Sequence, residues 1–116
     1  MDLKQGTKAM DQEQVVMGII INAGQARSLY FEALKQAKKG DLKGAGEKMI
    51  EAQGYVSEAH KVQTQLIEED EGEGKVSMTL IMVHAQDHLM TAMLAGELIR
   101  ELIDVYRQLK VKHTDD

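Results

Sequence analysis

Apolar residues recur at intervals of three and four positions along most of the 116-residue chain. This interval is the period of an amphipathic α-helix, which turns its apolar side toward a core. Three runs share the pattern, over residues 12–39, 42–68 and about 75–110. We therefore expect three long helices that pack against one another.

The segments between the runs contain residues that end and begin helices. Lys38, Lys39 and Gly40 suit a helix C-terminus, and Asp41 suits the N-cap of the next helix. Because so short a connection turns the chain back, the second helix should run antiparallel to the first. An acidic stretch with glycines, residues 68–74, predicts a solvated loop before the third helix.

The predicted fold class is all-α, an antiparallel three-helix bundle with a single domain over residues 12–110. Residues 1–11 lack periodicity and predict a flexible lead-in, and residues 111–116 predict a loose tail. Helices of ~27 to 35 residues would be ~40 to 50 Å long, so the bundle should be elongated rather than globular. Gly18 and Gly24 in the first run suggest close approach of a neighbouring helix.

Composition narrows the possible functions. The absence of cysteine excludes disulfides and thiolate metal sites. A net charge of −5 without a concentrated basic face argues against binding of nucleic acid. The chain has no signal-peptide pattern and no apolar run of membrane-spanning length, so we expect a cytoplasmic protein. No glycine loop of the kind that binds phosphates precedes a Lys-Ser or Lys-Thr pair, so no nucleotide is expected.

Two histidines and a carboxylate interrupt the apolar pattern of the third run. His84 and His88 lie one helical turn apart and border an apolar stripe, while Gln86 lies on the opposite flank. Asp87 falls inside this stripe, and its neighbours there are all apolar: Val76, Leu80, Val83, Met90, Leu94, Leu98 and Val105. A carboxylate in such a stripe is costly to desolvate and needs a cation, a metal, hydrogen-bond donors or a proton.

The residues alone leave several interpretations open. One is a non-catalytic metal-binding helical bundle, in which His84, Asp87 and His88 hold the ion. Another is a histidine that acts as a nucleophile or as an acid–base group. A third is a regulatory or adaptor bundle without enzymatic activity. A metalloprotease is disfavoured, because Ala85 occupies the position of the glutamate in His-Glu-x-x-His.

The segment Val83–Met90 resembles the signature of the IIA components of the lactose/cellobiose (N,N'-diacetylchitobiose) class of the phosphoenolpyruvate-dependent sugar phosphotransferase system. Residues 16–28, 33–38 and 58–68 resemble the same family, so the resemblance covers about residues 13–110. The departures from the family lie in the polar N-terminus and in the tail.

The resemblance implies a phosphoryl carrier, which is a phosphotransferase component. In this family, the histidine that matches His84 takes a phosphoryl group from phosphorylated HPr and passes it to the cysteine of a IIB protein. A sugar bound to the IIC membrane channel is the final acceptor, so the expected role is uptake and phosphorylation of a β-linked disaccharide. A neutral ring nitrogen attacks phosphorus, and the N–P bond keeps enough transfer potential for onward delivery.

The resemblance also implies an assembly and a set of site residues. His88 and Gln86 match residues near the family's active site, and His88 is placed to donate a hydrogen bond to the phosphoryl oxygens. Gln86 points about 160° away from His84 on an ideal helix, so it would act from a neighbouring subunit or in packing. The family forms a homotrimer, a nine-helix bundle. There the residue matching Asp87 meets its two copies on the threefold axis around a divalent cation, expected to be Mg²⁺.

Overall fold

The computed structural model describes residues 3–115, and it describes the side chains of residues 12–111. The chain forms three α-helices and no strand over the described range. The helices are α1 (Leu3–Lys38), α2 (Leu42–Asp70) and α3 (Leu80–Asp115). The prediction of an all-α fold with three helices is confirmed.

Three of the predicted helix limits were too narrow. α1 begins at Leu3 rather than Gln12, α2 ends at Asp70 rather than at residue 68, and α3 ends at Asp115 rather than Lys110. The first three residues of the acidic stretch predicted as a loop therefore belong to α2. These polar ends can remain helical because adding residues to an existing helix is far easier than nucleating one. The flexibility predicted for the lead-in and the tail stays a prediction, and residues 1, 2 and 116 lie outside the described range.

The start of α3 was also predicted incorrectly. It was expected near Lys75, but the helix begins after Thr79, whose Oγ1 accepts a hydrogen bond from the Met82 amide at 3.2 Å. This is the role of an N-cap residue. Before it, the Asp70 side chain accepts a hydrogen bond from the Val76 amide at 2.9 Å, which holds the chain in a loop.

The turn between α1 and α2 has the predicted capping residues. Gly40 has a φ of +90°, a left-handed conformation that favours glycine at the end of a helix. Asp41 is the N-cap of α2, and its side chain accepts a hydrogen bond from the Gly44 amide at 2.9 Å. Lys110 of α3 donates a hydrogen bond to the Gly40 carbonyl at 2.7 Å, so the end of α3 lies against this turn.

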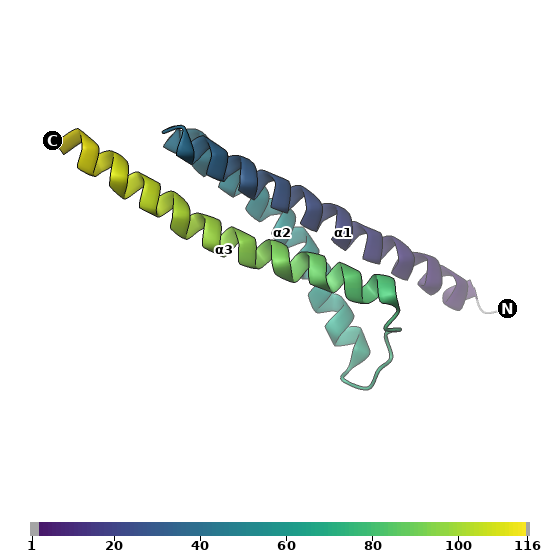
Figure 1. The fold of residues 1–116 in the computed structure, drawn as a ribbon. Helices are drawn as coiled ribbons and strands as arrows, with labels where there is room; N and C mark the ends of the chain where they lie inside the picture. The colour runs from purple at the N-terminus through teal and green to yellow at the C-terminus, as the bar shows by residue number, and fades with distance from the viewer. Residues whose placement is uncertain (1–2, 116) are drawn as a thin grey trace.

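The three helices form an elongated bundle, as predicted. α1 and α3 run in the same direction and α2 runs opposite to both (Figure 1). The molecule measures 73 × 22 × 19 Å, and its radius of gyration is 18.4 Å. A compact chain of this length would have a radius of gyration of about 13 Å. Within residues 3–115, none of the helices combines the length and apolar character that a membrane crossing requires.

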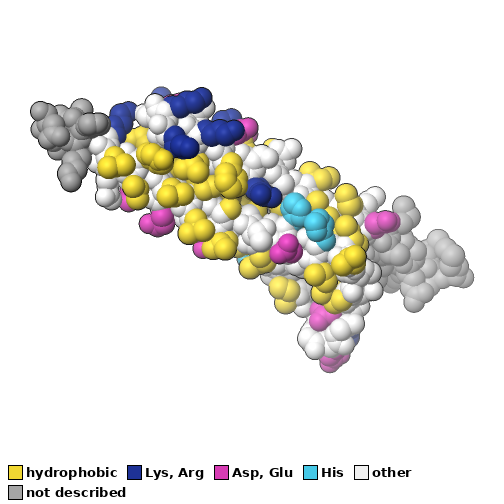
Figure 2. Space-filling model, viewed as in Figure 1, with side chains coloured by type: hydrophobic (Ala, Val, Ile, Leu, Met, Phe, Trp, Pro, Cys, Tyr) yellow, Lys and Arg dark blue, Asp and Glu magenta, His cyan; other side chains and the backbone are white. Residues whose placement is uncertain are grey.

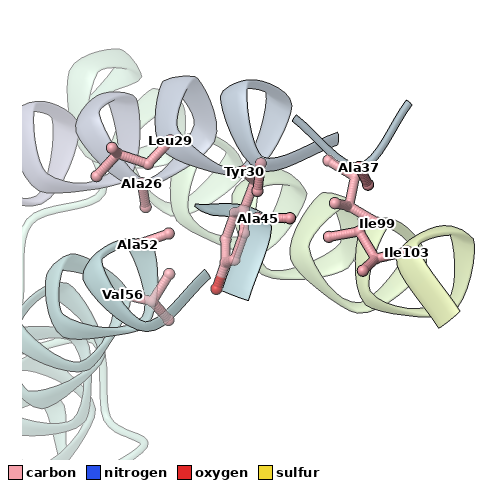
Figure 3. Packing of buried hydrophobic residues seen from close by; sticks show 10 residues of the cluster. Ala26, Leu29, Tyr30, Ala37, Ala45, Ala52, Val56, Ile99 and Ile103 are labelled. Carbon is pink, nitrogen blue, oxygen red and sulfur yellow. The ribbon is translucent and has the colours of Figure 1, made fainter. Parts of the chain in front are cut away.

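Alanines make up about half of the buried residues, and their small side chains let the helix axes lie close together. Tyr30 is the aromatic residue among the buried ones, and it extends from α1 into the space between α2 and α3 (Figure 3). Its hydroxyl donates a hydrogen bond to Gln53 Oε1 at 3.3 Å. The buried alanines come from all three helices: Ala23, Ala26, Ala33, Ala37, Ala45, Ala52, Ala59, Ala85 and Ala92.

The glycine that permits a close approach is Gly96, in α3. A Cβ atom at this position would lie 2.8 Å from Tyr30 Oη and still closer to the ring carbons. At Gly18 and Gly24, a Cβ atom would meet nothing within 4 Å. The prediction that these two glycines mark tight packing was therefore wrong. Their position in the sequence did not reveal that each faces open space.

Candidate functional site

The two predicted histidines lie together near the beginning of α3. Their ring centroids are 4.7 Å apart and the ring planes meet at 79°, an edge-to-face arrangement. His84 is exposed and His88 is half-buried. Ala85 and Leu89 follow them in sequence and are completely buried, so the rotation of the helix is fixed by packing. A partner molecule can therefore reach His84, with His88 one turn behind it.

Asp87 lies on an apolar stripe that faces away from the bundle. Figure 2 shows the stripe as a band of hydrophobic side chains along the molecule, with the imidazoles next to it. Its exposed members are Leu80, Val83, Met90, Leu94, Leu98, Val105 and Leu109. Within residues 12–111, no side chain forms an ion pair or hydrogen bond with the Asp87 carboxylate. The predicted stripe is present, but the single chain leaves Asp87 in contact with water.

Gln86 lies on the flank of α3 that faces α2. Its Oε1 accepts a hydrogen bond from Gln63 Nε2 at 2.7 Å, and its own Nε2 donates to Met82 Sδ at 3.5 Å. Both contacts hold it on the side away from His84. The expectation that Gln86 cannot reach His84 within one chain agrees with this placement.

The side chains of residues 12–111 do not form a metal site within one chain. Among the residues with described side chains, no three of the His, Asp and Glu side chains come together in a way that could hold a metal ion. The alternative in which His84, Asp87 and His88 together bind an ion within the chain is therefore wrong. His84 and His88 lie together, but Asp87 is turned about 60° from His84 and about 100° from His88 around α3, so its carboxylate lies on the outer stripe.

The sequence analysis did not predict one residue of this region. Gln63 of α2 contacts Gln86, yet it is a polar residue that follows no apolar period. The only signal was its position within residues 58–68, which resemble the family. Gln63 and Gln86 line a surface hollow of about 250 Å³, together with Ile67, Met78 and Met82 among others.

A second hollow lies between the N-terminal parts of α1 and α3. Its volume is about 300 Å³, and its apolar lining includes Val16, Met17, Ile81 and Met82. Met17 and Ile81 are both exposed, and Ile81 lies less than one turn before His84. Apolar surface is therefore present close to the exposed imidazole.

Comparison with known proteins places the chain in a family. The family model described as "PTS system, Lactose/Cellobiose specific IIA subunit" matches residues 14–107. The N,N'-diacetylchitobiose-specific EIIA component of Escherichia coli K12 is 59% identical over 104 residues, which are 90% of each chain. The lichenan-specific phosphotransferase enzyme IIA component of Bacillus subtilis is 42% identical over 85% of this chain and 90% of its own.

Solved structures show the same relationship. The cellobiose-specific enzyme IIA of Bacillus anthracis superposes with a TM-score of 0.83 at 42% identity, covering 87% of this chain and 93% of that one. The IIA(Chitobiose) chain in a complex with HPr from Escherichia coli gives a TM-score of 0.75 at 58% identity, covering 85% and 96%. The chain belongs to the lactose/cellobiose-specific IIA subunit family, and it is a phosphotransferase component of the sugar phosphotransferase system.

Proposed function

We propose that this chain carries a phosphoryl group on His84, from phosphorylated HPr to a IIB cysteine, in the cytoplasm. The observation that carries the proposal is the exposed imidazole of His84, edge-on to the half-buried His88 on a helix whose rotation is fixed by packing. A similar protein was solved in a complex with HPr. The name of the Escherichia coli relative favours N,N'-diacetylchitobiose among the β-linked disaccharides as the transported sugar.

The transfer chemistry needs only a neutral ring nitrogen on this chain. The lone pair of a His84 nitrogen attacks phosphorus while the bond from phosphorus to the donor breaks, and its electron pair leaves with the donor. In the second transfer, the IIB thiolate attacks and the electron pair returns to His84. The 4.7 Å separation of the rings supports a role for His88 as a hydrogen-bond donor to the phosphoryl oxygens.

The hollow beside Met17 and Ile81 is the expected docking surface for protein partners. Apolar groups at the centre of an interface exclude water, which strengthens the hydrogen bonds around the transferred group. The exposed apolar side chains within one turn of His84 support docking at this position.

We further propose that three copies assemble through the apolar stripe of α3 around a threefold axis. Continuous exposed apolar surface of this length is unusual for a monomer and favours association. Each copy would bring Asp87 to the axis, where three carboxylates repel one another unless a cation or protons offset the charge. Carboxylate oxygens are the ligands that Mg²⁺ prefers, and no described side chain of the same chain neutralises Asp87. We therefore expect a divalent cation at the axis, bound by the three Asp87 carboxylates.

The same assembly would give Gln86 a role near the phosphoryl group. In a cyclic trimer, one flank of each subunit meets the opposite flank of the next. His84 and Gln86 lie on opposite flanks of α3, so the Gln86 of one copy would approach the His84 of another. Gln86 would then stabilise the phosphoryl oxygens with its amide hydrogens.

The proposal is tested by incubating the protein with phosphoenolpyruvate, enzyme I and HPr, followed by mass spectrometry. The expected result is one acid-labile phosphoryl group on His84, and none in the His84→Ala variant. The matched control is His60→Ala, an exposed histidine of α2, which should be phosphorylated like the wild type. A wild-type chain that remains unphosphorylated would overturn the proposed function.

The role of His88 is tested separately. His88→Ala should still be phosphorylated on His84, but about tenfold more slowly, because a hydrogen bond to a charged group is lost. The measurement is the rate of transfer from phosphorylated HPr in a rapid-quench experiment. Equal rates in the variant and the wild type would mean that His88 serves only in packing.

A further inference from the structure

Two amide side chains join α2 to α3 on the flank away from His84. Gln63 Nε2 donates a hydrogen bond to Gln86 Oε1 at 2.7 Å, and both residues are half-buried. The same nitrogen of Gln63 lies 3.7 Å from Met90 Sδ, and Gln86 Nε2 lies 3.5 Å from Met82 Sδ. The amide of Gln86 is therefore held at its oxygen by Gln63 and at its nitrogen by Met82.

The two sulfur atoms favour the observed orientation of each amide. A thioether sulfur is a weak acceptor and cannot donate, so each amide forms a hydrogen bond there only through its nitrogen. The oxygen of Gln86 then faces Gln63, which is the arrangement observed. An amide nitrogen has two hydrogens, and within the described residues Gln86 Nε2 has one acceptor, Met82 Sδ. One N–H of Gln86 remains for an acceptor on another molecule.

This remaining N–H is close to open space. Gln63 and Gln86 both line the surface hollow of about 250 Å³, so an atom from a second molecule can approach the pair. An anionic phosphoryl oxygen is attracted by an amide hydrogen and repelled by an amide oxygen. The orientation of Gln86 therefore decides whether it stabilises or disfavours a phosphoryl group.

We propose that Gln63 is a positioning residue for phosphoryl transfer. It holds the Gln86 oxygen, and so presents the Gln86 N–H to the phosphoryl group on the His84 of an adjacent copy. Gln63 does not touch the phosphoryl group itself. The inference rests on the proposed function, since it requires both the phosphorylated His84 and the trimer.

Two substitutions of Gln63 should have different effects. Gln63→Leu removes the hydrogen bond and leaves the Gln86 amide free to rotate, so transfer should slow about fivefold. Gln63→Glu introduces a carboxylate, which only accepts, so Gln86 turns its nitrogen toward residue 63 and its oxygen outward. Transfer in Gln63→Glu should slow about tenfold or more, although glutamate has nearly the same shape as glutamine.

The experiment measures single-turnover transfer from phosphorylated HPr to the 116-residue chain. Gln65→Glu is the matched control, because Gln65 is exposed on the same helix and the charge change is identical. It should transfer at the wild-type rate. In the Gln86→Leu background, Gln63→Glu should cause no further slowing, since the amide that it orients is gone.

A direct readout comes from the side-chain amide signals in ¹⁵N NMR spectra. The Gln86 signals should shift in Gln63→Glu and remain in place in Gln65→Glu. Unchanged transfer in both Gln63 variants would overturn the inference, as would equal slowing by Gln63→Glu with and without Gln86. If the wild type transfers normally in these cases, the proposed function survives. Absence of any phosphoryl group on wild-type His84 would overturn both.

Discussion

The two apolar faces of α3 are built differently. The inner face has small residues at its closest contacts, such as Ala85, Ala92 and Gly96, and its larger members are almost fully buried. The outer stripe contains longer side chains, with Leu94 and Leu98 at 55% and 57% exposed, and includes the charged Asp87. A helix packed on one side only would not need leucines on its other side. The inner face explains the fold of one chain, whereas the outer stripe is the surface through which we propose that copies assemble.

The largest expected effect comes from charging the outer stripe. Leu94→Glu would place three carboxylates at the axis of the proposed trimer, close to those of Asp87 and without a partner. We expect the protein to sediment as a monomer at concentrations where the wild type is a trimer. Ile50→Glu is the control, because Ile50 of α2 is 76% exposed but lies outside the stripe. A Leu94→Glu trimer as stable as the wild type would show that the stripe is not the interface.

The difference between the two faces explains what the sequence could predict. Apolar spacing identified the three helices, because burial follows the helical period. On α3, however, the stripe that it picked out is the exposed one, and the buried residues of this helix lie on the other face. The spacing also separated the flank of His84 from the flank of Gln86. Spacing could not tell which of two apolar stripes on α3 faces the core, since both follow the same period. The stripe that faces the core is the one whose side chains fit against α1. Gly96 on that side of α3 leaves room for the Tyr30 ring.

Helix ends and polar contacts between helices were harder to predict. We predicted that α3 begins near Lys75. It begins after Thr79 instead, because the Thr79 side chain accepts a hydrogen bond from the Met82 amide and caps the helix there. The contact between Gln63 and Gln86 joins residues of different helices, and a period within one helix carries no information on it. Gly18 and Gly24 resemble Gly96 in sequence, yet only Gly96 lies against a large side chain.

A methyl group at Gly96 tests the inner face. Alanine normally favours a helix over glycine by about 1 kcal/mol. At Gly96 the added carbon would overlap the Tyr30 ring, and overpacking of this kind costs about 1 to 3 kcal/mol. We therefore expect Gly96→Ala to lower the free energy of unfolding, measured by urea denaturation.

The matched control for this substitution is Gly46→Ala in α2. A Cβ atom there would meet nothing within 4 Å, so the variant should be more stable than the wild type by about 0.5 to 1 kcal/mol. Opposite signs for the two variants would confirm that the inner face is closely packed. A stabilised Gly96→Ala would mean that α1 and α3 can separate without cost.

Removing the charge from the outer stripe should stabilise the proposed trimer, and by less than Leu94→Glu destabilises it. Asp87→Leu would replace three carboxylates at the axis by apolar groups, which should keep or strengthen the trimer by about 1 kcal/mol per subunit. The thermal midpoint of the wild type should fall when EDTA removes divalent cations, and that of Asp87→Leu should not. The Asp104→Leu variant, which removes an exposed carboxylate outside the stripe, should keep the response to EDTA. A wild type that is insensitive to EDTA would contradict a cation at the axis.

The smallest effect concerns Tyr30 of α1, whose ring lies against Gly96 on the inner face of α3. Burial raises the pKa of the Tyr30 hydroxyl above its ordinary value of 10.0, Arg100 opposes this shift and Glu97 adds to it. The folded state therefore holds the proton more tightly than the unfolded state. This contribution to stability is complete below about pH 10 and is lost as the pH rises through the folded-state pKa.

Tyr30→Phe separates this contribution from the packing of the ring. The variant keeps the ring beside Gly96 but loses the hydrogen bond to Gln53, so near neutral pH it should be about 0.5 to 1 kcal/mol less stable. Above about pH 10 the stability of the wild type should fall more steeply than that of Tyr30→Phe, and the difference between them should shrink. Urea denaturation at several pH values measures both curves. Parallel curves would mean that Tyr30 ionises as easily in the folded chain as in the unfolded one, so that water reaches its hydroxyl at the contact with Gly96, where the inner face is closely packed.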